Sequence, residues 1–412
     1  MDVIVIGGGI AGLAFALGLK QRGISCRVFE TAPELKALGV GITLLPHAVR
    51  ELSALGLEPR LREVAIENTY NAFFNRYGQL IYKELRGKLA GYPFPELGIH
   101  RGNLHMVLLE AATAQLGADS IQTNHHCTGV EHDEQGVTVH FTQTTTGARL
   151  APIRGDIAIA CDGVNSVVRK QFYPDDALAF GGINMWRGVV RHPPILDGRT
   201  YMRVGAIDTG KLVIFPIVDA DDQGNQLINW VAELRRPNAE RNDWNKPGKL
   251  EDFFDVYKDW RFDWLDVADL ISKTERILEY PMVDKDPVER WTFGRVTLMG
   301  DAAHPMYPRG ANGAAQALID SRTLADLLIQ TRDPREALTA YEAARLETTA
   351  TIVRTNRVNP PDVINTKVDA LSGGKPFRHI DDLISQEELK RICDDYAQIA
   401  GFSREAVNPT GH

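Results

Sequence analysis

Residues 2–13 read DVIVIGGGIAGL, and this stretch decides the fold. The run DVIVI is typical of a buried strand, and the small and apolar residues from Ile10 to Leu19 predict a packed helix. A second strand, CRVFE at residues 26–30, follows. A strand, a glycine turn, a helix and another strand form a βαβ unit, so the stretch predicts that a parallel sheet begins at residue 2.

The turn between the first strand and the helix carries the pattern G-x-G-x-x-G at Gly7, Gly9 and Gly12. In a dinucleotide site one glycine makes the tight turn, one lets the backbone approach a pyrophosphate, and one allows the helix to pack closely on the strand. The anion then lies at the positive helix N-terminus. Glu30 ends the second strand, where an acid can bind a ribose diol. A purely structural turn is the alternative, and the pattern alone does not separate FAD from NAD.

Two further motifs follow predicted strands. Residues 162–169 read DGVNSVVR after the strand GDIAIACDG, and residues 300–305 read GDAAHP after RVTLMG. With the glycine turn, they resemble the single-component flavoprotein aromatic hydroxylases typified by para-hydroxybenzoate hydroxylase, which carry DGxxSxxR and GDAAHPxxPxGxxG in this order. GGINMWRGVV, ILEYPMVDKDP and MYPRGANGAAQALID are similar to the phenazine-carboxylate monooxygenase subgroup of pyocyanin synthesis. The resemblance runs from residue 1 to about residue 350.

The resemblance implies an α/β fold, in which a Rossmann-like FAD-binding domain is interrupted by a β-sheet-rich substrate domain and followed by a helical C-terminal tail. Residues 176–235 are rich in β-branched and aromatic residues between turns, which favours antiparallel strands. Ser385 and Glu388 form a capping box for a tail helix that ends near Gly401. The expected segments are FAD-binding domain at 1–67, 101–175 and 281–355, a hairpin joining the substrate sheet at 68–100, substrate domain at 176–280, and tail at 356–412.

The same resemblance implies an FAD-dependent monooxygenase that hydroxylates an aromatic or N-heteroaromatic substrate with O2 and NAD(P)H, through a flavin C4a-hydroperoxide. FAD should be non-covalent, because no His or Cys lies in a recognisable attachment motif. NADH or NADPH should bind transiently as a co-substrate, because only one G-x-G-x-x-G follows a strand. The open alternatives are another flavoenzyme on this scaffold, such as a prenyl-chain reductase or a halogenase (whose WxWxIP motif is absent), and a non-enzymatic FAD-binding sensor.

The family pattern also implies which residues contact the cofactor. The three glycines of the turn hold the pyrophosphate, Glu30 holds the ribose, and Arg101 reaches the phosphate region. Asp162 serves FAD and NAD(P)H together, although it could simply begin a turn, and Asp301 contacts the flavin chain, although it could cap the next turn. The segment after Tyr307 lies against the isoalloxazine, with the positive end of the next helix directed at the reduced flavin. Its expected contact residues are Pro308, Gly310, Ala311, Asn312 and Gly313.

The substrate pocket should lie between the β-rich lobe and the flavin, with ordinary sheet packing as the alternative for each candidate. Arg309 could pair with a substrate carboxylate or raise the potential felt by reduced flavin, or it could point to solvent. His304 is expected to be structural and satisfied by backbone, and His125 and His126 to lie in a loop. The pocket candidates are Met185, Arg187, Phe215, Tyr280, Met282, Pro305 and Tyr307, and the catalytic candidates are Arg187, Tyr307 and Arg309.

Composition excludes several other classes. The formal net charge is −8 and no long basic run occurs, so a general nucleic-acid binder is not expected. No stretch reaches the roughly 18 apolar residues that a membrane span needs. The four cysteines are scattered without a CxxC pair, which suits a reducing cytoplasm and argues against a disulfide framework or a metal site. A monomer or a homodimer remains open.

Overall fold

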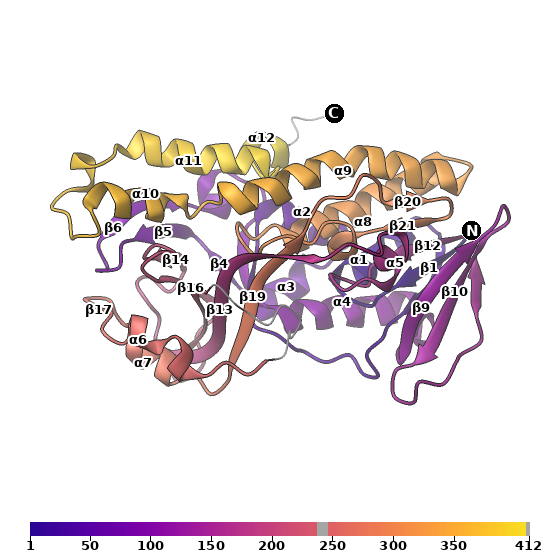
Figure 1. Cartoon of the computed structure of the whole chain (residues 1–412), viewed down its shortest axis with the longest axis horizontal. Helices are drawn as coiled ribbons and strands as arrows, with labels where there is room; N and C mark the ends of the chain where they lie inside the picture. The colour runs from indigo at the N-terminus through magenta and orange to yellow at the C-terminus, as the bar shows by residue number, and fades with distance from the viewer. Residues whose placement is uncertain (237–245, 409–412) are drawn as a thin grey trace.

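The computed structural model describes residues 1–236 and 246–408. Residues 237–245, inside the expected substrate domain, and 409–412, at the end of the expected tail, lie outside the described residues. A mostly parallel sheet of six strands forms one lobe (Figure 1), which confirms the α/β prediction. Its strands, in spatial order, are β20 (Thr292–Phe293), β21 (Val296–Leu298), β12 (Ile157–Ala160), β1 (Asp2–Ile6), β2 (Ser25–Phe29) and β8 (Ile121–Gln122).

Strand β1 lies at the centre of this sheet, paired in parallel with β12 and β2. Its apolar run is continuous because both faces of the sheet are covered, and Val3, Ile4 and Val5 are fully buried. Helix α1 (Ile10–Gln21) packs between α4 (Arg101–Leu116) and α8 (Gly313–Gln330). The shorter helices α2 (Pro46–Ala54), α3 (Glu58–Val64) and α5 (Val167–Phe172) complete the lobe.

A three-stranded antiparallel ribbon projects from this lobe, at the far right of Figure 1. It consists of β9 (His125–His132), β10 (Val137–Gln143) and β11 (Ile153–Gly155). The expectation that His125 and His126 lie in a loop is therefore wrong, because both begin β9 and pair with β10. The ring of His125 packs against Phe29 and Phe141, a tertiary contact that the local sequence does not reveal.

The second lobe is built on a seven-stranded sheet. One face packs on α6 (Phe254–Tyr257), α7 (Val267–Ser272) and the short hairpin β17 (Arg261–Phe262) and β18 (Leu265–Asp266), where Trp186 stacks on Phe253. The other face looks toward the first lobe. The strands, in spatial order, are β19 (Ile277–Lys285), β13 (Leu178–His192), β16 (Gln226–Arg235), β15 (Lys211–Val218), β14 (Thr200–Val204), β5 (Tyr70–Phe74) and β6 (Leu80–Leu85).

Strand β19 crosses the domain boundary that we expected after residue 280. Pro281, which cannot donate a ladder hydrogen bond, lies within this strand. It is tolerated because β19 is the edge strand of the sheet. The strand continues to Lys285 and pairs with β13 on both sides of a bulge between Phe180 and Asn184.

A small antiparallel sheet joins the two lobes. It contains β3 (Gly41–Leu44), β7 (Glu96–His100) and β4 (Ala65–Asn68). Its backbone lies directly on the seven-stranded sheet, because a Cβ at Gly41 would overlap Asn229 and Ile217, and a Cβ at Gly98 would overlap the carbonyl of Pro216. Glycine at these two positions therefore allows the lobes to approach closely.

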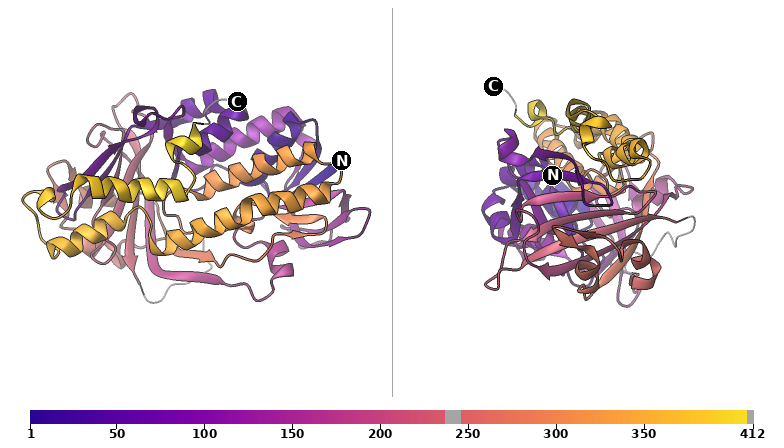
Figure 2. Two further views of the ribbon diagram at one scale, coloured as in Figure 1. Left: turned by 90° about the horizontal axis from the view of Figure 1, so that it is seen from above. Right: turned by 90° about the vertical axis from the view of Figure 1, so that its left-hand side faces the viewer.

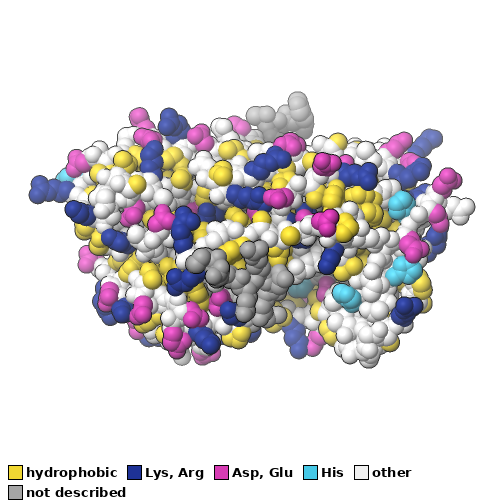
Figure 3. Space-filling view, in the orientation of Figure 1, with side chains coloured by type: hydrophobic (Ala, Val, Ile, Leu, Met, Phe, Trp, Pro, Cys, Tyr) yellow, Lys and Arg dark blue, Asp and Glu magenta, His cyan; other side chains and the backbone are white. Residues whose placement is uncertain are grey.

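The chain ends in four helices, α9 (Pro334–Val358), α10 (Val363–Ser372), α11 (Gln386–Ile399) and α12 (Arg404–Val407). They run along one long side of the molecule and span both lobes (Figures 1 and 2). As expected, the Ser385 hydroxyl caps α11 by accepting a hydrogen bond from the Glu388 N–H. Charges of both signs are interspersed over the face in Figure 3. Within the described ranges, no helix is long and apolar enough to cross a membrane.

One buried arginine joins the two sequence motifs that follow β12 and β21. Arg169, fully buried, donates to both carboxylate oxygens of Asp176 at 2.8 and 3.0 Å. Its remaining N–H groups donate to the carbonyls of Ala302, Ala303 and Asp286. The arginine of the DGxxSxxR motif thus holds the backbone of the GDAAHP motif in place.

Replacing Arg169 with Met should lower the free energy of unfolding by about 3–5 kcal/mol, because it breaks a buried ion pair and strands three carbonyls. Urea denaturation followed by circular dichroism measures this loss. Arg154→Met is a matched control, because Arg154 makes an exposed pair with Asp133 and its loss should be much smaller. Equal losses in the two variants would show that Arg169 does not hold the motifs together.

Candidate functional site

The glycine turn contains two positions that the fold itself requires. Gly7 has a φ of +106°, and a Cβ there would overlap the carbonyl of Cys161 at the end of β12. A Cβ at Gly12 would overlap the carbonyl oxygen of Gly7. These two glycines therefore let α1 begin immediately after β1 and pack against it.

Gly9 is different, because nothing in the protein requires a glycine there. Its φ of −79° and ψ of −170° suit any residue, and a Cβ would meet no atom within 4 Å. The open space lies at the start of α1, where the first-turn N–H groups have no intrahelical acceptor. A pyrophosphate needs such a bare approach to a helix N-terminus, so the turn fits the phosphates of a dinucleotide.

Glu30 lies beside this turn at the end of β2. Its two carboxylate oxygens accept hydrogen bonds from the N–H groups of Gly8 and Ala32, each at 2.7 Å. The ring of His105 reaches the carbonyl of Gly8 at 2.6 Å from α4. The carboxylate is only partly buried, and each oxygen has a second lone pair, so it can still accept from a ribose diol.

Two exposed charged side chains have no hydrogen-bond or ion-pair partner among the described residues. Arg101 is the first residue of α4, and its guanidinium makes no hydrogen bond or ion pair there. Asp301 lies in the 3₁₀ turn Gly300–Ala302, and its side chain does not cap that turn. A Cβ at Gly313 would lie 4.0 Å from an Asp301 carboxylate oxygen, so this acid lies over the start of α8. Both charges are available to a ligand.

The two carboxylate oxygens of Asp162 differ in their hydrogen bonding. Its Oδ2 accepts from the N–H of Val167 at 2.9 Å and so stabilises the turn into α5. Its Oδ1 is buried with no hydrogen-bond partner, and burial raises the pKa of this carboxyl. The turn role that we left open is therefore present, and the second oxygen is buried without a partner.

The segment from Pro308 to Gly313 forms a strained loop before α8. Ala311 has a φ of +55°, a left-handed conformation that costs a residue with a Cβ about 1 kcal/mol or more. Asn312 occupies the N-cap position of α8 but its side chain makes no capping hydrogen bond. The first-turn N–H groups of α8 thus remain free at the positive end of an 18-residue helix.

His304 has a structural role in this region. Its Nε2 lies 2.5 Å from Asp320 Oδ2, so its partner is a side chain and not the backbone that we expected. Burial would raise the pKa of Asp320, but His304 and Arg345 outweigh that effect and lower it to about 2. The buried carboxylate of Asp320 therefore holds His304 in place. No local sequence pattern reveals this pair.

The inner face of the seven-stranded sheet gathers most of the predicted pocket residues. One apolar cluster contains Met185, Phe215, Met282 and Tyr307, with Tyr280 packed against it. A Cβ at Gly181 would lie 3.0 Å from the Tyr307 hydroxyl, so glycine lets that ring approach the sheet. Pro305 is buried beside His304 but is not part of this cluster.

The two arginine candidates have different surroundings. Arg187 Nη2 donates to the carbonyl of Gly41 at 2.9 Å, its Nε has no partner, and burial lowers its pKa. The Arg309 side chain is 9% exposed and does not point to solvent. Its Nη2 lies 4.0 Å from both Glu233 and Asp362, which also bind Lys211. Arg187 thus holds the lobe junction, and Arg309 joins a buried charge cluster.

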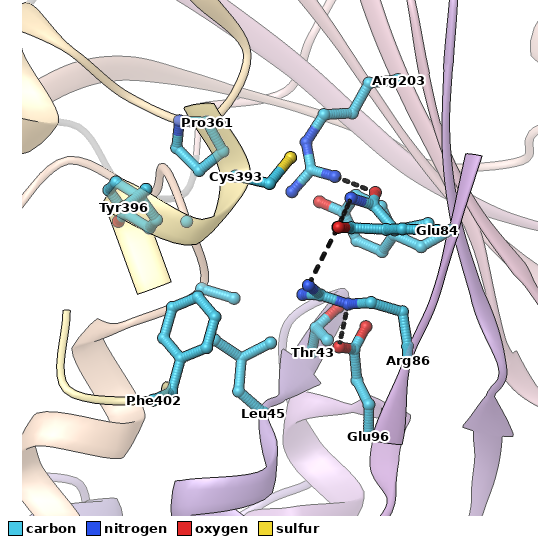
Figure 4. A pocket seen from close by; sticks show the side chains of 14 residues that line it. Thr43, Leu45, Glu84, Arg86, Glu96, Arg203, Pro361, Cys393, Tyr396 and Phe402 are labelled. Atoms are coloured by element: carbon cyan, nitrogen blue, oxygen red, sulfur yellow. Dashed lines mark hydrogen bonds and ion pairs between the residues drawn. The ribbon is translucent and has the colours of Figure 1, made fainter. Parts of the chain in front are cut away.

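A small cavity of about 20 Å³ lies between the sheet, the loop before α8 and the tail (Figure 4). Arg203 projects into it, donating to the Asn71 amide oxygen and covering the Tyr201 ring at 4.4 Å. Sequence reasoning missed Arg203, although strand alternation places it on the same face as Tyr201. The cavity is also lined by Gly310, Ala311, Cys393, Tyr396 and Phe402.

No carboxylate among the described residues lies within 4.0 Å of the Arg203 guanidinium, which is 8% exposed. Its neighbours in the cavity are paired, since Arg86 binds Glu96 at 2.7 Å and Glu84 at 3.2 Å. Glu84 and Glu96 line the same cavity, and the positive charge of Arg203 opposes the rise that burial causes in the pKa of Glu96. Arg203 therefore has carboxylates in its field but none in direct contact, which leaves its guanidinium available to a ligand anion.

The chain is similar in sequence and in fold to several known proteins. The profile of a family described as an FAD binding domain matches residues 1–356. A phenazine 1,6-dicarboxylic acid hydroxylase from Lysobacter antibioticus is 40% identical over 362 residues, covering 86% of this chain and 89% of the relative. A 3-amino-4-hydroxybenzoate 2-monooxygenase from Streptomyces cremeus is 33% identical over 86% of both chains. The crystal structure of Klebsiella pneumoniae HpxO with FAD and uric acid covers 100% of this chain and 98% of its own, at a TM-score of 0.79 and 25% identity.

Gly9→Val should fold normally but bind FAD at least about 100-fold more weakly, because the side chain would fill the space over the α1 N-terminus. Fluorescence titration of FAD and thermal unfolding of the apoprotein measure both effects. Gly12→Val is the contrasting variant, expected to unfold because its side chain would overlap the Gly7 carbonyl. Wild-type FAD affinity in folded Gly9→Val would contradict the assignment of the turn to the cofactor.

Proposed function

Because this chain belongs to the family with the FAD binding domain, and is an FAD-dependent aromatic monooxygenase that uses O2 and NAD(P)H, we propose that it hydroxylates an aromatic or N-heteroaromatic carboxylate. The observation that carries the proposal is Arg203, a buried guanidinium without a carboxylate partner, which lines the cavity beside Gly310 and Ala311. A carboxylate is the anion that the planar guanidinium fork binds best among common aromatic substituents.

The names of the relatives agree with this substrate class. They include hydroxylases of phenazine 1,6-dicarboxylic acid, 3-hydroxybenzoate and 6-hydroxynicotinate, at 40%, 32% and 29% identity. Each of these substrates combines an aromatic or heteroaromatic ring with a carboxylate. The apolar cluster around Met185 and Phe215 supplies a surface for such a ring, and Arg203 supplies the charge at its edge.

We assign the cofactor site to residues that have unpaired polar groups or free space beside them. Gly9 and the α1 N-terminus would hold the pyrophosphate, Glu30 the ribose, and Arg101 and Asp301 the chain between them. The loop Pro308–Gly313 would lie against the isoalloxazine, and the α8 N-terminus would stabilise negative charge on it. Bound FAD supplies the activation of O2, and the protein binds, orients and shields the substrate.

Arg187 and Arg309 take positioning roles in this proposal. Arg187 and Asn229 both bind Gly41 of β3, at 2.9 and 2.8 Å, and so hold the small sheet at the junction. Arg309 anchors the loop before α8 through its ion pairs with Glu233 and Asp362. Tyr307 lies in the apolar cluster, where its ring would pack against the substrate. We therefore assign its hydroxyl no role in proton transfer.

The division of the chain into a cofactor lobe, a substrate lobe and a tail is part of the proposal, with the boundary after residue 280 moved to the end of β19. We also propose a cytoplasmic enzyme that acts as a monomer or a homodimer. All four cysteines are free, and three are buried, which supports a reducing compartment. Among the described residues no group of His, Cys, Asp and Glu could hold a metal ion.

Arg203→Gln should raise the KM for an aromatic carboxylate substrate by about 10- to 100-fold, because a charge-assisted hydrogen bond is lost. The corresponding carboxamide should be a poor substrate of the wild type and should lose little further in the variant. Steady-state NAD(P)H oxidation with both compounds measures the difference.

Arg154→Gln, on the exposed ribbon, is the control for a change of charge remote from the cavity. It should leave both KM values unchanged. If Arg203→Gln weakens the carboxylate and the carboxamide equally, Arg203 does not recognise the charge and the substrate proposal fails.

A further inference from the structure

The loop before α8 needs support from outside itself. Gly310 and Ala311 both have left-handed φ angles, of +72° and +55°. The side chain of Asn312 turns away from the N-cap role and donates instead to the Gly310 carbonyl at 3.0 Å. A strained segment keeps its conformation only where its surroundings hold it.

Tyr396, on tail helix α11, supplies that support. Its hydroxyl accepts from Asn312 Nδ2 at 2.9 Å and donates to Asn356 Oδ1 on α9 at 2.7 Å. It also lies 3.4 Å from the carbonyl of Arg309. A Cβ at Gly310 would overlap the same hydroxyl, so the loop and the tyrosine are in direct contact. One hydroxyl therefore meets the loop at Arg309, Gly310 and Asn312.

The environment of this hydroxyl makes the link specific. Tyr396 is 4% exposed, and Asn312 and Asn356 are 1% and 0% exposed. Burial raises the pKa of Tyr396, so its hydroxyl remains protonated and can donate. Removal of the hydroxyl leaves Asn356 Oδ1 without its donor, whereas Asn312 Nδ2 keeps only its bond to the Gly310 carbonyl.

The tail itself has separate anchors. Tyr92 donates from its hydroxyl to the carbonyl of Phe402 at 2.8 Å, and Gln316 Nε2 donates to the carbonyl of Ala400 at 3.2 Å. Phe402 packs against the rings of Tyr396 and His47. Removal of the Tyr396 hydroxyl should therefore leave α11 in place and release only the loop.

We propose that Tyr396 is a positioning residue that holds Gly310–Asn312 in the conformation that receives the flavin, so that the C-terminal tail completes the cofactor site. This inference rests on the assignment of the loop to FAD under the proposed function. Without the hydroxyl the loop relaxes, and FAD must order it again on binding, which weakens the complex. The free N–H groups at the start of α8 also lose their fixed position against the reduced flavin.

The test is Tyr396→Phe, which removes one oxygen atom. The variant holoenzyme should release FAD about tenfold more readily on dilution, followed by flavin fluorescence, from the loss of two hydrogen bonds. Its flavin midpoint potential should become more negative, because the anionic reduced form is stabilised less. Asn312→Ala should weaken FAD similarly, and the double variant should be no worse than either single one, because both changes break one link.

Tyr92→Phe is the matched control, since it removes a tyrosine hydroxyl that anchors the same tail without touching the loop. It should retain the wild-type FAD release and midpoint potential. Circular dichroism and thermal unfolding confirm that each variant is folded. Wild-type values in Tyr396→Phe, or equal changes in Tyr92→Phe, overturn the positioning role.

Gly313→Val separates this inference from the loop assignment on which it rests. A Cβ at Gly313 meets nothing closer than 4.0 Å, so the variant should fold, but its side chain would stand over the α8 N-terminus. If Gly313→Val binds FAD like the wild type, the loop does not face the flavin and the assignment fails. If it loses FAD while Tyr396→Phe keeps it, the loop assignment stands and the role of Tyr396 is refuted.

Discussion

The whole structure depends on the contact between Gly12 and the carbonyl of Gly7. Only a residue without a Cβ can stand there, and it lets α1 start directly at the end of β1. The N-terminus of α1 is then fixed at the carboxyl edge of the parallel sheet, where ligands of open α/β sheets bind. The same device recurs at Gly41 and Gly98, where the backbone of the small sheet lies on the substrate sheet. Close backbone approach therefore shapes both the turn that we assign to the cofactor and the junction of the lobes.

Buried polar ties hold distant parts of the chain around this edge. Arg169 binds the carbonyls of Ala302 and Ala303 across more than a hundred residues of sequence, and Asp320 holds His304 in the same region. Tyr396 brings a third segment, the tail, to the loop that follows. Each tie places its backbone within narrow limits. A rigid frame of this kind suits a cofactor whose chemistry requires orientation more than acids or bases.

Much of this could be predicted because the signals are local. The glycine turn, the strand DVIVI, the capping by Ser385 and the confirmed α/β class each follow from adjacent residues, and five of the seven pocket candidates share one cluster. The ribbon that contains His125, the continuation of β19 through Pro281 and the partner of His304 depend on tertiary neighbours, so no local pattern reveals them. Arg203 was missed for the same reason, since only the folded structure shows that this strand arginine is buried with no carboxylate in direct contact.

The most direct test of the central claim is to trace the oxygen atom from O2 into the product. The holoenzyme is supplied with NAD(P)H, ¹⁸O2 and each of phenazine 1,6-dicarboxylate, 3-hydroxybenzoate and 6-hydroxynicotinate, and products are analysed by mass spectrometry. An aromatic monooxygenase acting on a carboxylate of this class should give a hydroxylated product that carries one ¹⁸O atom, with one NAD(P)H oxidised per product. Hydroxylated product whose oxygen comes from water, or substrate-stimulated NAD(P)H oxidation that yields only hydrogen peroxide with every aromatic carboxylate offered, would contradict the account.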